Sequence, residues 1–458
     1  MFDLASAAPA IDAALLGGNA RVLRVTTDSR DLRAGDLFVA LKGGRFDGHA
    51  FVDQVLAKGA AAAMVSDPGT VKSASSPLLV VADTRLALGR LASWWRSRFD
   101  ITLTAVTGSN GKTTVKEMLA ASLRMHAGAD AVLATQGNLN NDIGVPLTLL
   151  GLRSNHRYAV IEMGMNHLGE IAYLSRLARP TIALINNAGT AHIGEVGSVE
   201  GIARAKGEVF EGLAQTGICV INGDDAFAAF WRGLAKSRRV VDFGLDKRAS
   251  VTARYELTDS GSLVTVRMPD AEFVARLAVP GVHNVRNALA AATAAWVAGV
   301  SPANIVAGLA SHAGVKGRMQ QLRLPDGMLV IDDTYNANPD SMKAALSVLA
   351  PRAGKRVFVM GDMGELGAVV VAMHAEVGAF ARRAGIDRLY ALGEGAAAAA
   401  QAFGDGAAHF DSVESLVASL RGDLGPDTTV LVKGSRFMRM ERIVEALAGD
   451  LSKLPRGV

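Results

Sequence analysis

The chain of 458 residues contains a single cysteine, Cys219. No disulfide bond can form within it, which is typical of proteins that work in the reducing cytosol. It also lacks an uninterrupted apolar run of about 18 residues, the length that a membrane-spanning helix needs. The first residues, MFDLASAAPAIDAALL, show neither the positively charged leader nor the cleavage pattern of a signal peptide. We therefore expect a cytoplasmic protein without a membrane span.

Charged residues make up only 20% of the chain, and acidic and basic side chains nearly balance, with a formal net charge of +4. No run of lysine and arginine is interleaved with aromatic residues, so the composition argues against a nucleic-acid-binding protein. Apolar residues, by contrast, make up half of the chain. This supply of core material excludes intrinsic disorder and suffices for about two to four domains of ordinary size.

Short apolar runs alternate with helical patterns along most of the chain. Strands are predicted at 36–41, 61–65, 78–82, 101–106, 158–161, 181–185, 218–221, 329–332, 356–360, 388–392 and 429–432, and helices include 49–58 and 396–402. Such alternation predicts mostly parallel sheets covered by helices on both faces. Residues 250–279 differ, because their alternating apolar pattern around TDSG predicts an antiparallel hairpin. Changes of pattern near residues 83 and 315 mark two domain boundaries.

A glycine-rich turn lies between an apolar strand and a helical pattern in AVTGSNGKTTVKEML, residues 105–119. Backbone N–H groups at such a turn bind phosphate, the ammonium of Lys112 can reach the outer phosphates, and Thr113 offers a hydroxyl to Mg²⁺. The spacing departs from the common phosphate-binding loop, because Val106 stands where that pattern has its first glycine. An ordinary strand–helix turn is the alternative, but Lys112 and the two hydroxyls at the helix start favour nucleotide binding.

Two other strand ends carry polar groups that could act beside this loop. Glu162 follows the apolar residues of YAVIEMG and is the candidate acidic partner of a metal ion; a solvated carboxylate is the alternative. His192 lies in NNAGTAHIG, where the alternative is a hydrogen-bonded loop histidine.

Lys206 falls on the apolar face of the helix predicted in SVEGIARAKGEVFEGLA. At 100° per residue, one stripe of this helix contains Ile202, Lys206, Val209 and Leu213. Glu208 and Glu211 point elsewhere, so neither offers an obvious local ion pair. Desolvation lowers the pKa of a lysine, and the neutral amine can react with CO₂ to form a carbamate that binds a cation. The alternative is a lysine that extends to solvent or pairs at long range.

Longer strings of the sequence resemble the Mur ligases, the ATP-dependent amide-forming enzymes of peptidoglycan synthesis. TTDSRDLRAGDLFVALKGGRFDGHAFV is similar to the uridine-nucleotide domain of this family, and TGSNGKTT to its ATP loop. TQGNLNNDIGVPLTLL, EMGMNHLGEI, AKGEVF and GVHNVRNALAA match the central domain, and GRMQ, DDTYNANPDSM, GDMGELG and VKGSRFMRME match the C-terminal domain. The resemblance covers nearly the whole chain, and its Asn-Leu-Asn-Asn and Tyr-Asn-Ala-Asn-Pro strings are especially specific.

The resemblance implies an α/β fold in three domains. A small N-terminal α/β domain, residues 1–83, would bind the UDP substrate, and a central P-loop ATPase-like parallel sheet, residues 84–315, would bind ATP. A C-terminal Rossmann-like α/β domain, residues 316–458, would bind the incoming amino substrate and close over ATP. The strings are nearest to the branch that adds D-alanyl-D-alanine to UDP-N-acetylmuramoyl-tripeptide through an acyl phosphate, as a monomer. They leave open whether the third residue of the tripeptide is diaminopimelate or lysine.

The resemblance also implies roles for individual residues. Catalysis would depend on Lys112, His192 and Lys206. The ATP contacts would be Gly108, Ser109, Asn110, Gly111, Lys112, Thr113, Thr114, Asn284, Asn287, Arg318 and Asp333. Two Mg²⁺ ions would be held, one by Thr113 and Glu162, the other by His192 and a carbamate formed from CO₂ on Lys206. The uridine substrate would contact Ser29, Arg30, Arg45, Asp47 and His49, the muramoyl-peptide Asn138, Asn140, Asn141 and Asp142, and the dipeptide Tyr335, Asn336 and Asn338.

Three other functions share parts of this pattern. A folate-extending glutamate ligase would have the ATP loop and the carbamylated lysine but would lack the N-terminal uridine domain. A ligase that adds diaminopimelate would carry a D-N-P-R string in the C-terminal domain, and a nucleotide-dependent switch or binding module would carry a guanine-reading N-K-x-D string; neither is present. The apolar run 368–372 stands where relatives are polar, and a buried patch, a contact surface and simple drift all remain open for it.

Overall fold

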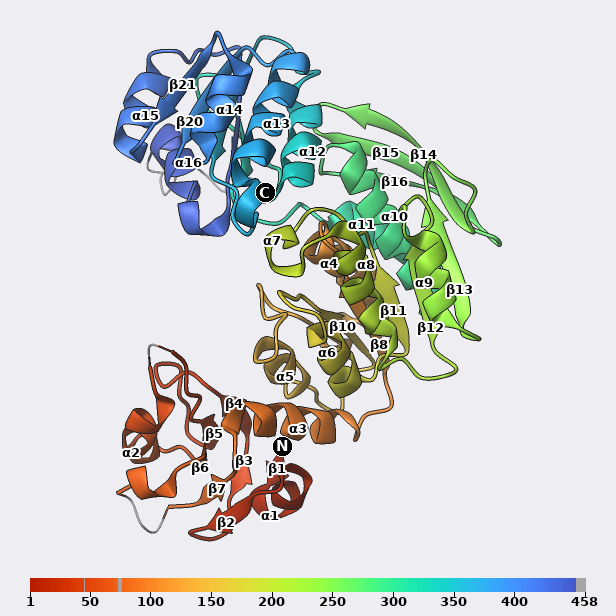
Figure 1. The fold of residues 1–458 in the computed structure, drawn as a ribbon. Helices are drawn as coiled ribbons and strands as arrows, with labels where there is room; N and C mark the ends of the chain where they lie inside the picture. Colours follow the sequence, from red (N-terminus) through yellow and green to blue (C-terminus); the bar gives the residue numbers. More distant parts are fainter. Residues whose placement is uncertain (45, 73–75, 450–458) are drawn as a thin grey trace.

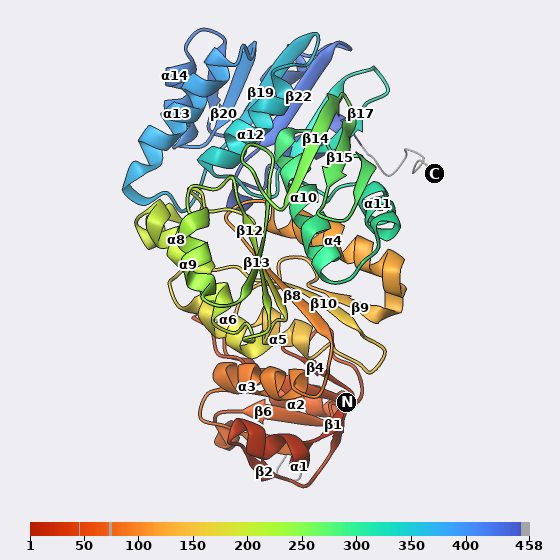
Figure 2. The same ribbon diagram turned by 90° about the vertical axis from the view of Figure 1, so that its right-hand side faces the viewer.

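The computed structural model of the chain describes residues 1–44, 46–72 and 76–449. These residues form three α/β units, each with its own main sheet, arranged in chain order (Figure 1). The N-terminal and C-terminal units lie at opposite ends of the central unit in both side views (Figures 1 and 2). The α/β class and the three-part organisation predicted from the sequence are confirmed.

The N-terminal unit is built, within the described residues, on a five-stranded sheet with the order β2-β7-β6-β5-β4. Its strands are β2 (Ala14–Leu16), β4 (Arg24–Thr26), β5 (Asp36–Val39), β6 (Ala62–Val65) and β7 (Leu78–Val80), with a separate pair of β1 (Phe2–Asp3) and β3 (Arg21–Val22). Its helical segments are α1 (Leu4–Ala7), η1 (Ala8–Ile11), η2 (Gly48–Phe51), α2 (Val52–Ala57) and η3 (Pro68–Thr70). The strands predicted around 36–41, 61–65 and 78–82 are confirmed in shorter form.

Helix α3 (Thr84–Arg96) connects the N-terminal unit to the central unit. The carboxylate of Asp83 begins the helix by accepting hydrogen bonds from the backbone N–H groups of Arg85 at 2.7 Å and Leu86 at 2.9 Å. The helix packs against η1 and against α5 (Gly144–Leu149) and α6 (Glu170–Ala178) of the central unit. This packing makes α3 the shared wall of the two units.

The central unit is built on a sheet that has nine strands in the described part of the chain. Their order is β16-β15-β14-β13-β12-β11-β8-β10-β9. The strands are β8 (Thr102–Thr107), β9 (Val132–Ala134), β10 (Tyr158–Glu162), β11 (Ile182–Ile185), β12 (Ile218–Asn222), β13 (Arg239–Gly244), β14 (Val251–Thr258), β15 (Gly261–Arg267) and β16 (Glu272–Leu277). The strands from β9 to β14 are parallel, whereas β14, β15 and β16 are antiparallel. The predicted hairpin at 250–279 therefore exists, and β16 extends it to three strands.

Helices cover both faces of the central sheet because successive strand residues point to opposite sides. Ala105 of β8 packs in the cluster formed with α3, α5, α6, α8 (Val199–Gly207) and α9 (Ala228–Ala235). Its neighbour Val106 packs instead with α4 (Lys112–Ala127), α10 (Val282–Val297) and α11 (Pro302–Ser311). The short segments η4 (Ala129–Ala131), α7 (Ile193–Val196) and η5 (Glu208–Phe210) complete the unit.

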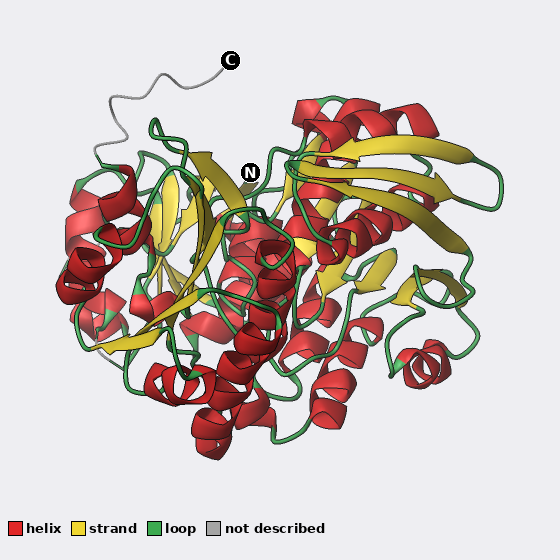
Figure 3. Ribbon diagram, turned by 90° about the horizontal axis from the view of Figure 1, so that it is seen from above, coloured by secondary structure: helices red, strands yellow, loops and turns green. Residues whose placement is uncertain are grey.

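The C-terminal unit contains, among the described residues, a six-stranded sheet with the order β17-β18-β22-β19-β20-β21. Its strands are β17 (Gln320–Arg323), β18 (Leu329–Asp333), β19 (Lys355–Gly361), β20 (Arg388–Leu392), β21 (Ala407–Phe410) and β22 (Thr428–Lys433). One face packs on α12 (Pro339–Leu349), α13 (Val370–Arg383) and α14 (Ala396–Phe403), the other on α15 (Val413–Arg421) and α16 (Glu441–Ala448), with η6 (Gly367–Val369) and η7 (Arg436–Met438) in loops. Figure 3 looks down on this unit and shows helices on both sides of its strands.

The apolar run 368–372 spans the end of η6 and the start of α13. Its side chains are largely exposed, with Val371 at 63%, and only Val370 packs against the core of the C-terminal unit. Burial therefore does not explain why this run is apolar. No helix in the described part of the chain combines the length and the apolar character needed to cross a membrane.

Candidate active site

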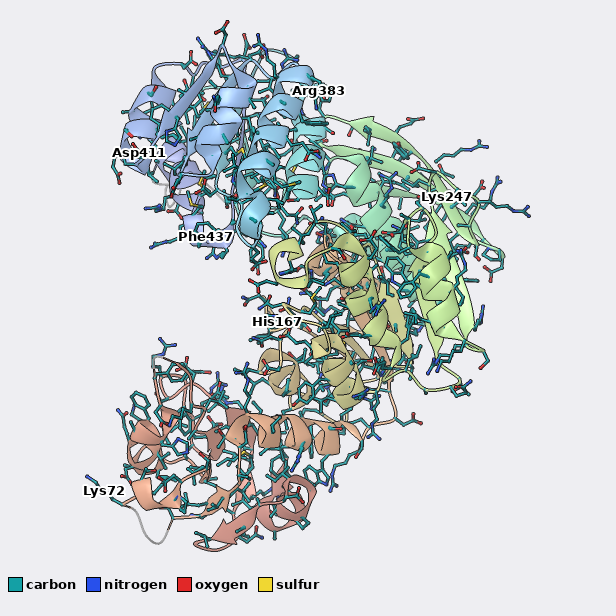
Figure 4. All side chains as sticks on the ribbon, viewed as in Figure 1. Lys72, His167, Lys247, Arg383, Asp411 and Phe437 are labelled. Atoms are coloured by element: carbon teal, nitrogen blue, oxygen red, sulfur yellow. The ribbon has the colours of Figure 1, made fainter. Side chains whose placement is uncertain are left out.

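A cavity of about 680 Å³ lies between the carboxyl ends of the central parallel strands and the C-terminal unit. The predicted site residues that line it are Ser109, Asn110, Gly111, Lys112, Thr113, Thr114, Asn138, Asn140, Asn141, Glu162, His192, Asn284, Asn287, Arg318, Asp333, Tyr335, Asn336 and Asn338. Asn166 and Arg436 also line the cavity. Figure 4 labels their chain neighbours, His167 on the central unit and Phe437 on the C-terminal unit. The tertiary structure thus brings together residues from across the central and C-terminal units.

The glycine-rich loop joins β8 to α4, and the helix begins at Lys112 as predicted. The ammonium of Lys112 donates to the carbonyl oxygens of Gly108 at 2.7 Å and Ser109 at 3.2 Å, and burial lowers the pKa of this lysine. Gly111 has a φ of 78°, and a Cβ there would lie 2.2 Å from Oδ1 of Asn287. Only glycine therefore fits at the start of α4, which leaves its first N–H groups facing the cavity.

Glu162 lies at the end of β10, beside the end of β8 in the parallel register. It is 2% exposed, which excludes the solvated carboxylate considered from the sequence. The hydroxyl of Thr113 donates to Oε2 of Glu162 at 2.9 Å, and the side-chain amide of Asn140 donates to Oε1 at 2.8 Å. Arg318, from the C-terminal unit, donates to the same Thr113 hydroxyl at 3.0 Å.

The oxygens of Thr113 and Glu162 fit the oxygen-seeking ion Mg²⁺. The described residues contain no group of three or more histidine, cysteine, aspartate or glutamate side chains that could hold a metal ion alone. A Mg²⁺ ion at these two oxygens would need phosphate and water oxygens as its remaining ligands, as is usual for nucleotide enzymes.

Lys206 lies in α8 and is completely buried. Its ammonium nitrogen has no hydrogen-bond partner among the described residues, so neither an extended nor a paired lysine is observed. Burial, followed by the nearby charge of Lys112, lowers the pKa of Lys206 well below its ordinary value. The predicted stripe is buried as well, although α8 ends at Gly207 and the last two of its members, Val209 and Leu213, lie beyond the helix.

His192 precedes α7 and has a φ of 65°, in the left-handed region that few residues other than glycine adopt. Its Nδ1 lies 2.6 Å from Oε2 of Glu365, which belongs to the C-terminal unit. Glu365 also lines the cavity. Glu365 was not among the predicted site residues, although the family-like string GDMGELG contains it.

Asn284 and Asn287 lie one turn apart near the start of α10 and are both buried. Asn287 donates to Oδ1 of Asn284 at 3.2 Å and accepts from Asn186 at 3.0 Å, and Asn186 also donates to the carbonyl of Asn110 at 2.9 Å. These amides connect α10 to the glycine-rich loop. Asn186 carries no sequence signal apart from its position at the end of β11.

Asn338 precedes α12 and caps it by accepting from the backbone N–H of Ser341 at 2.9 Å. Its amide also donates to Oδ1 of Asn110 at 2.8 Å. Near it, Oδ2 of Asp340 accepts from the backbone N–H of Thr190 at 2.8 Å and from its hydroxyl at 2.9 Å. The C-terminal unit is therefore hydrogen-bonded directly to the loops at the carboxyl end of the central sheet.

Two more predicted residues of the C-terminal unit have partners there. The guanidinium of Arg318 lies 4.1 Å from the centre of the Tyr335 ring. Asp333 pairs with Lys433 at 2.6 Å and accepts from the backbone N–H of Met319 at 3.1 Å. Lys433 and Asp340 were not among the predicted site residues, because their partners come from other segments of the chain.

The predicted uridine-binding residues lie in the N-terminal unit, outside the cavity, except Arg45, which lies outside the described residues. Ser29 lies beside Arg30, which is 89% exposed and pairs with Asp28 at 2.7 Å. Nδ1 of His49 lies 2.6 Å from Asp47, and its Nε2 accepts from the backbone N–H of Ser66 at 2.9 Å. Both ring nitrogens of His49 are therefore used within the unit.

Three predicted residues of the central unit do not line the cavity: Gly108, Asp142 and Lys206. Gly108 lies just behind the loop, with a φ of 155°. Asp142 accepts from the guanidinium of Arg85 on α3 at 2.7 Å, which links the Asn-Leu-Asn-Asn loop to the wall shared with the N-terminal unit.

Comparison with known proteins gives matches along nearly all of this architecture. Three family models match: "Mur ligase family, catalytic domain" at residues 21–96, "Mur ligase middle domain" at 106–295 and "Mur ligase, glutamate ligase domain" at 317–436. The UDP-N-acetylmuramoyl-tripeptide–D-alanyl-D-alanine ligase of Escherichia coli K12 is 45% identical over 437 residues, 94% of this chain and 95% of the relative.

Two solved structures have the same overall arrangement. MurF from Acinetobacter baumannii superposes with a TM-score of 0.91 at 40% identity, over 97% of this chain and 98% of that one. The MurF ligase of Thermotoga maritima, solved in complex with ADP, has a TM-score of 0.83 at 29% identity, over 95% and 98% of the two chains. With its three matched domains and a glycine-rich strand–helix loop at the cavity, the chain belongs to the Mur ligase family, the ATP-dependent ligases of peptidoglycan synthesis.

Proposed function

We propose that the chain joins D-alanyl-D-alanine to UDP-N-acetylmuramoyl-tripeptide and converts ATP to ADP and phosphate. The observation that carries the proposal is the convergence of Lys112, Thr113 and Glu162 with Arg318 of the C-terminal unit at one cavity. The near full-length similarity to a relative that bears this activity in its name supports the choice of substrates. Residues 1–83 would hold the uridine part, 84–315 ATP, and 316–458 the incoming amine.

In the first step, a carboxylate oxygen of the tripeptide attacks the γ-phosphorus of ATP. The bond from this phosphorus to the β–γ bridging oxygen breaks, so that ADP leaves and an acyl phosphate forms. Two anions must meet in this step, and the charges of Lys112 and Arg318 neutralise them. A Mg²⁺ ion held by Thr113 and Glu162 would supply further charge to the phosphate oxygens.

In the second step, the neutral amine of D-alanyl-D-alanine attacks the acyl carbon. The carbon–oxygen bond to phosphate breaks, phosphate leaves with that oxygen, and the amine gives up a proton as the amide forms. Water would hydrolyse the acyl phosphate, so the site must be covered during this step. The hydrogen bond that Asn338 donates to Asn110 and the one that Asp340 accepts from Thr190 support a covering role for the C-terminal unit.

The remaining site assignments are part of the same proposal. Asn284 and Asn287 would face the adenine ring, and Asp333 would support the nucleotide. Asn138, Asn140, Asn141 and Asp142 would face the muramoyl-peptide, and Tyr335, Asn336 and Asn338 the dipeptide. We also propose a monomer that works in the cytoplasm, where ATP and nucleotide-linked precursors are available; light scattering on the purified chain tests its oligomeric state.

Lys206 would carry a carbamate. Its neutral amine would attack the carbon of CO₂ and release one proton, which leaves an anionic oxygen pair on the nitrogen. A buried amine without a hydrogen-bond partner supports this assignment, because the unmodified ammonium would be an unpaired buried charge. The carbamate and His192 would hold a second Mg²⁺ ion.

Mass spectrometry of the product tests the proposed substrates. The enzyme would be incubated with ATP, UDP-N-acetylmuramoyl-tripeptide and D-alanyl-D-alanine, with L-alanyl-L-alanine, D-glutamate and diaminopimelate as competing amines. We expect the D,D-dipeptide adduct, with one ADP and one phosphate per product. A product formed only with diaminopimelate, or with glutamate on a folate, would assign the chain to one of the rival ligases, and ATP turnover without any adduct would favour a switch.

Carbon-13 NMR of the enzyme equilibrated with ¹³CO₂ tests the carbamate without reference to activity. We expect a carbamate carbon signal that is absent from Lys206→Ala. Lys116→Met is the matched control, because Lys116 is also completely buried but donates to the carbonyl of Thr135 at 2.7 Å. Loss of the signal only in Lys206→Ala, with partial recovery of its activity by a short carboxylic acid, is the expected result. A wild-type spectrum without the signal would contradict the carbamate.

A further inference from the structure

Two short segments from different units meet at one wall of the cavity. The backbone carbonyl of Glu365 accepts a hydrogen bond from the N–H of Gly194 at 2.9 Å. Its carboxylate lies 2.6 Å from Nδ1 of His192, a close contact whose angle falls short of a hydrogen bond. One residue of the C-terminal unit is thus held at both its backbone and its side chain by the segment that follows β11. The second contact involves the histidine that lines the same cavity.

The backbone at this contact is unusual on both sides. His192 has a φ of 65° and Glu365 a φ of 61°, so two non-glycine residues in the left-handed region face each other across the boundary of the units. Such conformations persist only when the surrounding structure enforces them, and they concentrate at functional sites.

Backbone atoms of the two units approach each other closely around the contact. A Cβ on Gly194 would lie 2.7 Å from both the carbonyl oxygen of Glu365 and the backbone nitrogen of Gly367. Ile193, between the two residues that contact Glu365, packs against the core of the C-terminal unit to which Leu366 belongs. The position of His192 is therefore coupled to the position of the C-terminal unit.

The charges at the contact suit an orienting role. At 2.6 Å, a carboxylate oxygen of Glu365 would be repelled by a bare lone pair on Nδ1, so this contact requires a proton on that nitrogen. An ionised carboxylate can only accept a hydrogen bond, so the proton of a neutral imidazole is drawn to Nδ1. The lone pair of Nε2 is then free for a ligand, as in histidines that bind metal ions with a carboxylate behind them.

We propose that Glu365 is a positioning residue that holds His192 in its Nδ1–H form and orientation, so that docking of the C-terminal unit completes the cation-binding side of the cavity. The part that concerns the cation rests on the proposed function of His192. The part that concerns the imidazole does not, and it can be tested in the protein without nucleotide or metal.

Nitrogen-15 NMR of the full-length protein labelled at histidine tests the orientation directly. The signals of His192 are identified by their loss in His192→Asn. We expect the Nδ1–H form in the wild type and a shift toward the Nε2–H form in Glu365→Ala, with recovery in Glu365→Gln, whose amide oxygen still accepts a hydrogen bond. Glu195→Ala removes an exposed carboxylate three residues from His192 and should change nothing. An unchanged His192 spectrum in Glu365→Ala would overturn the proposal.

Electron paramagnetic resonance of Mn²⁺ in the presence of a non-hydrolysable ATP analogue tests the cation. We expect two bound ions in the wild type, and in Glu365→Ala a loss of affinity of at least about tenfold for one of them only. Two sites of unchanged affinity in Glu365→Ala would overturn the role in cation binding. A wild type with one site would instead contradict the proposed role of His192 itself, while the NMR result would still decide whether Glu365 orients the ring.

Discussion

The side-chain amide of Asn338 donates to Oδ1 of Asn110 at 2.8 Å, which connects the residue that caps α12 to the glycine-rich loop 228 positions earlier in the chain. Asp340, two residues further on, accepts two hydrogen bonds from Thr190. The C-terminal unit is thus attached to the glycine-rich loop and to the loop that follows β11. We therefore expect substitutions in the C-terminal unit at this contact to alter the properties of the glycine-rich loop.

Replacing Asn338 should loosen this attachment. Asn338→Ser retains a side-chain oxygen to cap α12 but is too short to reach Asn110, so we expect a stable protein whose C-terminal unit is less firmly docked. Loss of this hydrogen bond, worth about 0.5–1.5 kcal/mol, should raise the KM for ATP by up to about tenfold. Small-angle scattering should show a larger radius for the free variant, reduced again by nucleotide and acceptor together. A profile and a KM equal to those of the wild type would mean that the contact contributes nothing to docking.

Removing the ammonium of Lys112 should abolish ADP formation. In Lys112→Ala the loop loses the charge that neutralises the phosphates, whereas the backbone turn depends on Gly111 and should remain. We expect circular dichroism and the melting temperature to stay close to those of the wild type and nucleotide turnover to fall by several orders of magnitude. Turnover within about tenfold of the wild type would contradict the assignment of this loop.

Lys116 should influence the requirement for Mg²⁺, although it does not line the cavity. It donates to the carbonyl of Thr135, whose hydroxyl accepts from the backbone N–H of Glu162 at 2.9 Å. In Lys116→Met we expect Glu162 to be less well placed, so that half-maximal ADP release needs several-fold more Mg²⁺, with Lys58→Met as an exposed control. If the melting temperature falls but the Mg²⁺ requirement does not change, the role of Lys116 is structural only.

The stability of the protein should fall in mild acid because of His283, which lines the cavity at the start of α10. Burial lowers the pKa of His283 from 6.5 to about 4. Between these values the unfolded chain binds a proton that the folded chain does not, so the free energy of unfolding decreases as the pH falls from 6.5 toward 4 and is unaffected above 6.5.

The loss from His283 at pH 5 is at most about 2 kcal/mol, and less in practice because part of the ring is exposed to the cavity. In His283→Gln this contribution disappears, so the melting temperature should change less between pH 7 and pH 5 than in the wild type. Equal pH profiles of the two proteins would show that the folded-state pKa of His283 is not lowered.

Much of the architecture could be predicted because it depends on local patterns. Buried parallel strands such as β11 and β19 contain continuous apolar runs, and both were predicted. Short or half-exposed edge strands escaped notice: β17 and β21 contain polar residues, and β9 has only three. Their place in a sheet comes from the neighbouring strand, because an edge strand needs only one partner and only one well-packed face.

By itself the sequence determined the chemistry of the glycine-rich loop, the acid at the end of β10 and the lysine in an apolar stripe. Each of these is a pattern of adjacent or helically spaced residues, and the fold preserved it. Only the tertiary structure decided that Glu365 faces His192 and that Asn338 faces Asn110. These contacts depend on how two separate sheets dock, and that docking is set by the shape and packing of whole surfaces, which no local period in the sequence encodes.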